Sequence, residues 1–251
     1  MFNEGLVSII MPAWKADQFI SEAIQSVIGQ TYDNWELLIV DDCSPDSTVE
    51  VVEKFCETDS RITLLKQYKN QGPASARNLA LQKAEGRWIA FLDSDDVWSN
   101  KKLEAQLVFH QSTSAVLSFT GYSRFTGEQR SGRAINVPSK LNYHQLLRNT
   151  CIATSTVLID RRLSGSFVMK NTYYDDFVCW LDMLRGGSFA VGLNQPLMKY
   201  RVLPGSVSRN KIKSAMEVWK ILRTFEGLTL SASLMCFISY AFHGILKYAR
   251  F

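Results

Sequence analysis

The sequence predicts an α/β fold with a mostly parallel sheet flanked by helices, and three observations lead to that expectation. Apolar runs of strand length alternate with amphipathic helical segments up to residue 111. The runs are almost continuously apolar, as in strands that are covered on both faces. Polar clusters rich in aspartate follow several runs, and open parallel sheets bind ligands at the carboxyl ends of their strands.

The first half contains four expected strands, at residues 6–13, 35–42, 61–67 and 87–96. The first helix, over 17–30, repeats apolar residues at helical spacing: Phe19, Ile20, Ala23, Ile24, Val27 and Ile28. A second helix, over 44–59, starts with N-cap residues and places Val49, Val52, Phe55 and Cys56 on one face. The third helix, over 74–86, is expected to end at Gly86 as a C-cap, and a fourth covers 99–111.

The pattern changes after about residue 115. Strands are expected at 115–126, 154–160, 188–193 and 196–202, without tight alternation with helices. A helix over 172–187 has a glycine stop, and the chain from Lys211 to Phe251 is expected to be helical throughout. We therefore expect one domain over residues 1–210 and a helical extension over 211–251.

Composition excludes several classes of protein. Of the 251 residues, 46% are hydrophobic, which suits a globular core, and the net charge of +4 does not indicate nucleic-acid binding. The five cysteines are scattered without a CxxC pair, which predicts a reducing compartment without disulfides or structural zinc. The N-terminal segment lacks the basic region and cleavage site of a signal peptide, so a cytoplasmic protein is expected.

The segment FLDSDDVW brings together three carboxylates, Asp93, Asp95 and Asp96, at the end of the fourth expected strand. Like charges so close raise one another's pKa unless a cation lies between them. Mg²⁺ or Mn²⁺ suits oxygen ligands and leaves coordination positions for water or phosphate. Two alternatives remain: a solvated turn that caps the next helix, and a phosphatase-like aspartyl nucleophile, which needs this motif after the first strand.

With the other strand ends in view, the sequence resembles family 2 of the nucleotide-sugar glycosyltransferases, which have the GT-A fold. The matching stretches are VSIIMPAWKADQFISEAIQSVIGQTYDNWELLIVDDCSPDST, NQGPASARNLALQKAEGRWIAFLDSDDVW, YYDDFVCWLDML and YRVLPGSVS. The pairing of NTCIATSTVLIDR with the helical tail looks most like the teichuronic-acid and O-antigen-type polysaccharide transferases.

The resemblance implies a role for each matching position on the donor side. Asp42 would accept a hydrogen bond from the uracil ring with support from Asp41, and Arg77 would reach the ribose or diphosphate. Asp95 would hold the Mn²⁺ or Mg²⁺ ion with Asp96 close by. The remaining donor-side positions are Pro12, Ala13 and Trp14 around the nucleoside, Asp93 and Ser94 near the sugar or ribose, and Arg201 beside the diphosphate.

On the acceptor side, the resemblance implies that Asp176 is the general base, with Asp175 and Trp180 supporting the acceptor pocket. The alternative for the two aspartates is a helix N-terminal pair favoured by the helix dipole. Two departures from the family stand out: Asp175 replaces a glutamate, and Leu203 occupies a position where many members have histidine. Tyr200, Arg201, Ser206 and Ser208 are either part of a loop over the diphosphate or surface turn residues.

The expected tail helix is amphipathic. Its polar stripe comprises Thr229, Ser233, Cys236, Tyr240, His243, Lys247 and Arg250, and its apolar side comprises Leu230, Leu234, Phe237, Ile238, Phe242 and Ile245. Basic residues precede it: Arg209, Lys211, Lys213, Lys220 and Arg223. This combination suits an anionic membrane surface. The alternatives are an apolar face packed on the domain and a transmembrane span.

The function that follows is an inverting, metal-dependent glycosyltransferase, with a UDP-sugar favoured as donor. The acceptor would be an oligosaccharide or a polyprenyl-diphosphate-linked sugar, at the inner face of the cell membrane, in the synthesis of a bacterial surface polysaccharide. A sugar-nucleotide pyrophosphorylase needs a glycine-rich loop after the first strand, which MPAWKAD lacks. The remaining alternative is a degenerate transferase that serves as an assembly partner at the membrane.

Overall fold

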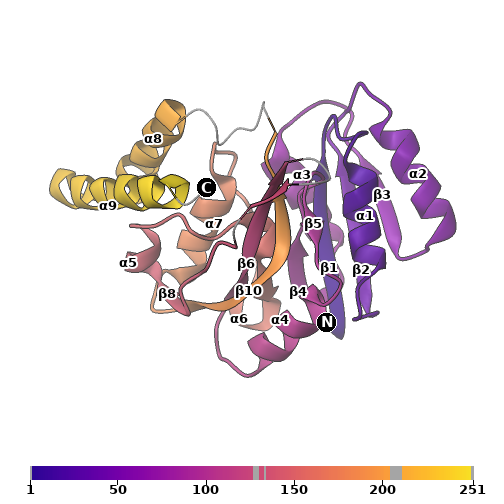
Figure 1. Ribbon diagram of the computed structural model, residues 1–251, viewed down its shortest axis with the longest axis horizontal. Helices are drawn as coiled ribbons and strands as arrows, with labels where there is room; N and C mark the ends of the chain where they lie inside the picture. Colours follow the sequence, from indigo (N-terminus) through magenta and orange to yellow (C-terminus); the bar gives the residue numbers. More distant parts are fainter. Residues whose placement is uncertain (1, 127–129, 133, 204–210, 250–251) are drawn as a thin grey trace.

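One sheet runs through the protein in a computed structural model that describes residues 2–126, 130–132, 134–203 and 211–249 (Figure 1). Its strand order is β3-β2-β1-β4-β9-β6-β10-β5. The chain starts in the middle at β1, builds outward through β2 and β3, and then returns to the other side of β1 with β4. This reversal is the switch point at which ligands bind in open α/β sheets.

The first half follows the expected alternation. The parallel strands are β1 (Asn3–Ala13), β2 (Trp35–Asp41), β3 (Ile62–Lys66) and β4 (Gly86–Phe91). The helices between and after them are α1 (Ile20–Ile28), α2 (Thr48–Thr58), α3 (Pro73–Lys83) and α4 (Lys102–Gln111). The strand ends that carry the aspartates therefore lie along one edge of the sheet.

The second half extends the sheet and contains its antiparallel strands. β9 (Leu158–Asp160) runs antiparallel to both β4 and β6 (Leu117–Thr126), and β10 (Phe189–Arg201) runs parallel to β6. The short strands are β5 (Val97–Trp98), β7 (Arg130–Ser131) and β8 (Lys140–Asn142). The short helices are α5 (Tyr143–Leu146), η1 (Thr154–Thr156) and α6 (Arg161–Ser164), followed by α7 (Asp175–Leu184). β6 and β10 point the same way as β1–β4, so β10 also ends at the aspartate edge.

Successive strand residues point to opposite faces of the sheet, and their side chains pack into two cores, one on each face. Ile10, Val40 and Phe91 pack with α3, α7 and residues of the C-terminal helices. Ile9 and Ile39 pack on the other face with α1, α2 and α4. Both faces are covered, which explains why the strand segments read as continuous apolar runs.

Three expected boundaries are wrong. Helix α3 ends at Lys83, and Gly86 is the first residue of β4, where a Cβ would lie 2.5 Å from the Leu6 carbonyl oxygen of β1. The segment 154–160 does not form one strand: it consists of η1, a single turn of 3₁₀ helix, followed by strand β9. The expected strands 188–193 and 196–202 form the single strand β10, whose register with β6 shifts around Pro196.

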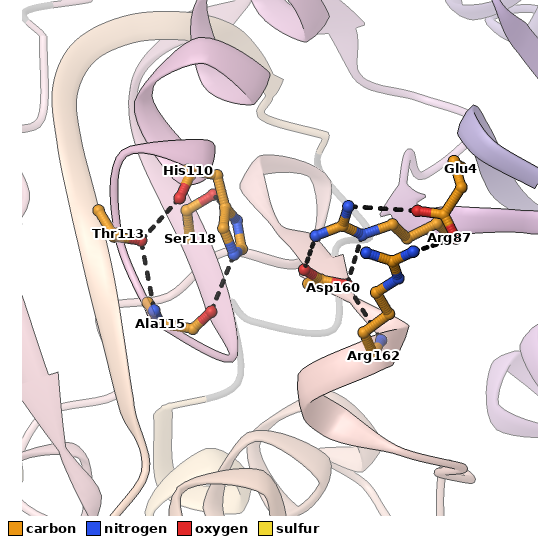
Figure 2. Close-up of polar contacts among 8 residues, drawn as sticks. All are labelled: Glu4, Arg87, His110, Thr113, Ala115, Ser118, Asp160 and Arg162. Atoms are coloured by element: carbon orange, nitrogen blue, oxygen red, sulfur yellow. Dashed lines mark hydrogen bonds and ion pairs between the residues drawn. The ribbon is translucent and has the colours of Figure 1, made fainter.

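Ion pairs join the strands at the edge opposite the aspartates, as Figure 2 shows. Arg87, at the start of β4, donates Nε to Oδ1 of Asp160 at 3.0 Å, and its Nη1 lies 3.4 Å from Glu4 at the start of β1. Arg162 donates its backbone N–H to Asp160 and pairs with Glu4 through its side chain. These contacts tie β1, β4 and β9 together at their far ends.

His110 lies buried beside this cluster (Figure 2). Both ring nitrogens have partners at 2.9 Å, Nδ1 with the Ser118 hydroxyl and Nε2 with the Ala115 carbonyl. Burial lowers the pKa of His110, because the charged imidazolium loses its hydration.

The C-terminal region consists of α8 (Lys211–Lys220), a π-helical segment (Ile221–Phe225) and α9 (Leu230–Ala249), separated by a break around Gly227. It is therefore not one continuous helix. In Figure 1, α8 and α9 lie at the opposite end of the molecule from α2. Val218, Ile221, Leu222 and Cys236 belong to the same core as β4 and α7, so the tail is docked on the domain.

Helix α9 docks with a mixed face inward, in which Phe237 and Tyr240 pack against the core beside two small residues. Ser233 and Cys236 are buried, while the exposed apolar residues of the helix are Leu230, Leu234, Met235, Ile238 and Phe242. The expected apolar face is therefore divided: Phe237 packs on the domain, whereas Leu230, Leu234, Ile238 and Phe242 are exposed. Among the described helices, none is long and apolar enough to cross a membrane.

Candidate functional site

The carboxyl ends of β1, β2, β4 and β10 meet at one rim of the sheet. Asp41 is the last residue of β2, Asp93 to Asp96 follow β4, and Arg201 is the last residue of β10. The first turn of α7 adds Asp175 and Asp176. The rim therefore collects acidic side chains that are far apart in sequence.

The loops after β1 and β2 are bound to each other. The Ala13 carbonyl accepts from Asp42 N at 2.8 Å, and Ser44 Oγ and Thr48 Oγ1 accept from the backbone of Lys15 and Ala16. Lys15 has φ +53° and Cys43 has φ +60°, so both loops hold L-residues in the left-handed region. Such backbone strain is characteristic of functional sites.

The expected nucleoside contacts lie at different depths. Pro12 is half-buried and Ala13 is buried in β1, whereas the Trp14 side chain is 50% exposed with Lys15 Nζ 4.6 Å from its ring centroid. Trp14 is thus the aromatic surface available for stacking at this rim.

Both carboxylate oxygens of Asp42 are hydrogen-bonded to the loop that precedes α3. Its two carboxylate oxygens accept the backbone N–H groups of Gln71 and Gly72, each at 2.7 Å. Gly72 has φ +86°, a conformation that suits glycine, and it places this N–H ahead of helix α3. The structure shows Asp42 fixing the loop before α3. Asp41 accepts from Ser44 N through Oδ2, and its buried Oδ1 has no partner among the described residues.

Arg77 forms a buried bridge. Its Nη1 donates to Asp175 at 2.7 Å and its Nη2 to Asp93 at 2.6 Å. The nearby carboxylates raise the pKa of Arg77 in spite of its burial, so it stays charged. We expected this guanidinium to reach the ribose or diphosphate; instead it joins the β4 loop to the start of α7.

Asp95 and Asp96 differ in their surroundings. Burial and the charge of Asp93 raise the pKa of Asp95 to about 6. Burial and the neighbouring Asp95 raise the pKa of Asp96, whose two oxygens accept from Ser155 Oγ at 2.6 Å and from Arg201 N at 3.1 Å. Asp96 therefore supports the loop, and Asp95 is the better candidate for a metal ligand.

A divalent ion would suit the carboxylate of Asp95, which lies close to the like charge of Asp93. A carboxylate whose charge is destabilised by a like charge gains from a cation, and Mg²⁺ binds through one or two carboxylates together with substrate phosphates. In the part of the chain that the structure describes, no cluster of three His, Cys, Asp or Glu side chains could hold a metal alone. The site therefore suits an ion that arrives with a diphosphate.

Asp176 lies at the first turn of α7 with both oxygens in defined contacts. Oδ2 accepts from Thr154 Oγ1 at 2.6 Å and Oδ1 from Phe177 N at 2.7 Å. Burial and the neighbouring Asp175 raise the pKa of Asp176 to about 6. A carboxylate with that pKa is ionised at neutral pH and is basic enough to accept a proton.

Other expected site residues have structural contacts. Trp180 is buried and packs edge-on against Phe91 at 5.6 Å between ring centroids, so it belongs to the core and not to the acceptor pocket. Arg201 donates Nε to the Asp95 carbonyl at 2.9 Å and pairs with Glu22, which places it under the aspartate loop. Ser94 is half-buried within that loop.

Ser206 and Ser208 lie outside the described residues. Sequence reasoning missed three residues that contact the site: Thr154, Ser155 and Glu22. The run of hydroxyl residues in TST was the signal for the first two, because three such residues in a row are unusual within a strand facing a core.

Comparisons with known proteins identify the family of this chain. The model of glycosyl transferase family 2 matches residues 8–164. The chain is 40% identical over 244 residues to the putative teichuronic acid biosynthesis glycosyltransferase TuaG of Bacillus subtilis, covering 96% of this chain and 97% of that protein. It is 39% identical over 248 residues to the UDP-Glc:alpha-D-GlcNAc-diphosphoundecaprenol beta-1,3-glucosyltransferase WfgD of Escherichia coli, covering 98% and 96%.

Solved structures show the same fold. TarS of S. aureus, in complex with UDP-GlcNAc, aligns with a TM-score of 0.69 at 18% identity over 87% of this chain and 66% of that one. The mannosyltransferase PcManGT of Pyrobaculum calidifontis, in complex with GDP-Man and Mn²⁺, aligns with a TM-score of 0.69 at 16% identity over 93% and 68%. The fold is GT-A, and the chain belongs to glycosyl transferase family 2.

Proposed function

We propose that this glycosyltransferase transfers a sugar from a UDP-sugar to a lipid-linked or oligosaccharide acceptor, with inversion at the anomeric carbon and with a divalent metal ion. The observation that carries the proposal is the rim itself, where Arg77 bridges Asp93 to Asp175, so that the loop with Asp95 is tied to the first turn of α7 with Asp176. The printed names of similar proteins support the substrates: UDP-GlcNAc is bound in TarS, and WfgD is named for a UDP-glucose donor and a diphosphoundecaprenol acceptor.

Asp176 is the general base of the proposed reaction. It takes the proton from the acceptor hydroxyl while that oxygen attacks the anomeric carbon from the face opposite the diphosphate. The bond between the anomeric carbon and the diphosphate oxygen breaks, and its electron pair leaves with the nucleoside diphosphate. One displacement of this kind inverts the configuration.

On the donor side, Asp95 would hold the divalent ion, which would supply positive charge to stabilise the departing diphosphate. Asp96 and Arg201 keep the Asp95 loop in position through their contacts with each other and with the loop backbone. Trp14 stacks on the base. Asp41 Oδ1 accepts from the base N–H, because this oxygen has no partner among the described residues and both oxygens of Asp42 have one.

The test is release of nucleotide from UDP-, GDP- and dTDP-sugars with and without Mn²⁺, on the wild type, Asp95→Ala and Asp176→Asn. We expect Mn²⁺-dependent turnover of one UDP-sugar, loss of Mn²⁺-dependent UDP binding in Asp95→Ala, and loss of transfer with retained UDP binding in Asp176→Asn. Asp182→Asn is the matched control, since Asp182 lies on the same helix in an exposed pair with Lys170. If the wild type lacks both turnover and metal-dependent UDP binding, the chain is an assembly partner and the proposal fails.

We also infer that the protein acts on the surface of an anionic membrane, in the synthesis of a bacterial surface polysaccharide. The name of TuaG refers to teichuronic acid biosynthesis, and the name of WfgD refers to a diphosphoundecaprenol-linked acceptor. The exposed apolar side chains of α9 add to Ile212 and Met216 on α8, which are 77% and 66% exposed. The basic residues between and beside them are Lys211, Lys213, Lys220 and Arg223. An apolar surface with basic neighbours matches the interface of anionic lipids.

Vesicle sedimentation tests this inference. The protein should bind vesicles with anionic lipid more strongly than neutral ones, and binding should weaken in high salt. The triple variant Leu234→Ser, Ile238→Ser, Phe242→Ser should lose binding, whereas Val108→Ser, a change at an exposed apolar residue of α4, should keep it. Equal binding of the triple variant and the control would show that α9 does not contact lipid.

A further inference from the structure

The turn η1 carries two hydroxyls that contact opposite parts of the site. We propose that Thr154 and Ser155 are positioning residues, one for the general base and the other for the metal-side aspartates, so that one turn sets how acceptor and donor face each other. This inference rests on the proposed function, because it assigns roles around the same site.

Thr154 fixes the orientation of the base. Its Oγ1 donates to Asp176 Oδ2 at 2.6 Å. The other carboxylate oxygen, Asp176 Oδ1, accepts from Phe177 N at 2.7 Å within α7. Thr154 is buried and Asp176 is half-buried, so the bond lies between the protein interior and the open side of the site. With both oxygens held, the carboxylate keeps one rotamer, and a catalytic group must stay within about 0.5 Å of its productive position.

Ser155 fixes the aspartate loop at two points. Its Oγ donates to Asp96 Oδ2 at 2.6 Å and accepts the backbone N–H of Asp93 at 3.0 Å. Its carbonyl accepts from Trp98 Nε1 at 2.7 Å, at the far end of the same loop. One serine therefore spans the loop from Asp93 to Trp98, with Asp95 between its contacts.

The turn itself is anchored to helix α4 and, through β9, to the sheet. Thr156 Oγ1 donates to the Ala153 carbonyl at 2.6 Å, and the Thr156 carbonyl accepts from buried Gln106 Nε2 at 2.9 Å. The strand β9 begins two residues later and pairs with β4, where Leu158 faces Ala90. A movement of the base relative to the aspartate loop would have to deform this turn.

The two contacts predict different kinetic effects. A hydroxyl that donates to a carboxylate stabilises its charged form, so loss of the Thr154 bond disfavours ionised Asp176. Thr154 is an uncharged donor to Asp176; the charged groups that face Asp176 are Asp175 and Arg77, and the titratable side chains of Tyr174 and Cys179 also lie near it. Loss of the Ser155 contacts releases the loop that carries Asp95 and leaves the base untouched.

The experiment compares Thr154→Val, Thr154→Ser and Ser155→Ala with the control Thr58→Val, at an exposed threonine whose hydroxyl bonds only to its own helix. Thr154→Val should lower kcat by roughly 10- to 100-fold, the range for a lost hydrogen bond to a charged group, with unchanged Mn²⁺-dependent UDP affinity. Its acid limb in the pH–rate profile should move to higher pH, and Thr154→Ser should restore both values. Ser155→Ala should instead weaken Mn²⁺-dependent UDP binding.

Several results would overturn the proposal. Wild-type kcat and pH profile in Thr154→Val, or the same loss in Thr154→Ser as in Thr154→Val, would show that the hydroxyl does not position the base. If the wild type itself has no transferase activity, the proposed function has failed, and a crystal structure of Thr154→Val decides the positioning question alone. A reoriented Asp176 carboxylate would support it, and an unchanged one would refute it.

Discussion

Replacing Arg77 by methionine should strongly destabilise the protein. Methionine keeps much of the volume of the side chain but removes the charge that bridges Asp93 and Asp175. The Asp175 side chain is only 8% exposed, so its carboxylate would remain inside the protein without a partner. An uncompensated charge in the interior is among the most destabilising defects that a single substitution can create.

The magnitude follows from the burial of the two pairs. Removing one partner of a buried ion pair costs about 3–5 kcal/mol. The pair with Asp175 falls in that class, whereas Asp93 is 32% exposed and can recover hydration, so it adds little. For a chain of this length, a loss of about 3–5 kcal/mol lowers Tm by roughly 6–20 °C.

The assay is urea unfolding of Arg77→Met, Asp175→Asn and the double variant, with Lys66→Met as control. Lys66 pairs with Glu53 at 2.6 Å, but both side chains are about half exposed, so the control should leave the midpoint unchanged. In the double variant no buried charge is left unpaired on the Asp175 side, so the single effects should not add, with a coupling energy of about 1–3 kcal/mol. A loss in Arg77→Met no larger than in the control, or purely additive effects, would refute this account of the bridge.

Three further predictions concern the base, the far edge and the loop before α3. Because burial beside Asp175 raises the pKa of Asp176 to about 6, kcat should fall as pH drops through 6, and a pH–rate profile without this limb would contradict the base assignment. The lowered pKa of buried His110 means that the unfolded chain binds a proton below pH 6.5 more readily than the folded protein does. The contribution of His110 to stability should therefore be constant above pH 6.5 and decline as pH falls below it, and His110→Gln should remove this component from the pH dependence of urea unfolding. Gly72→Ala should reduce the free energy of unfolding, measured in urea, by about 1–3 kcal/mol, because Gly72 has φ +86° and ψ 167°, a backbone conformation essentially restricted to glycine; a variant as stable as the wild type would contradict this account of the loop.

The parts of the fold that could be predicted are the helices and strands whose apolar residues recur with a regular spacing in the sequence. The first four strands and helices follow from continuous apolar runs and helical spacing, and the aspartates at the strand ends follow from the parallel arrangement. Strand β9 could not be predicted as a partner of β4, because that pairing joins residues about 70 positions apart and depends on the whole sheet.

The side-chain roles were harder to predict for the same reason. The pattern placed Asp42 and Arg77 at the rim, but their partners, Gly72 for one and Asp175 for the other, are 30 and 98 residues away. For α9, the spacing of Ser233 and Cys236 identified two faces of the helix. Which face docks depends on the shape and size of the side chains that it meets, so Ser233 and Cys236 came to lie inside together with the rings of Phe237 and Tyr240.

The position of β9 has a consequence for the order in which the chain can fold. As the protein is synthesised, β1 to β4 emerge together, but the outer neighbour of β4 is made only after about 70 more residues. Until then β4 presents an unpaired edge with apolar side chains on both faces, which invites pairing with another chain. A fragment ending after α4 would keep that edge permanently, so we expect this first half of the chain to aggregate when expressed alone. Any transplant of this half into another protein must carry β9 with it.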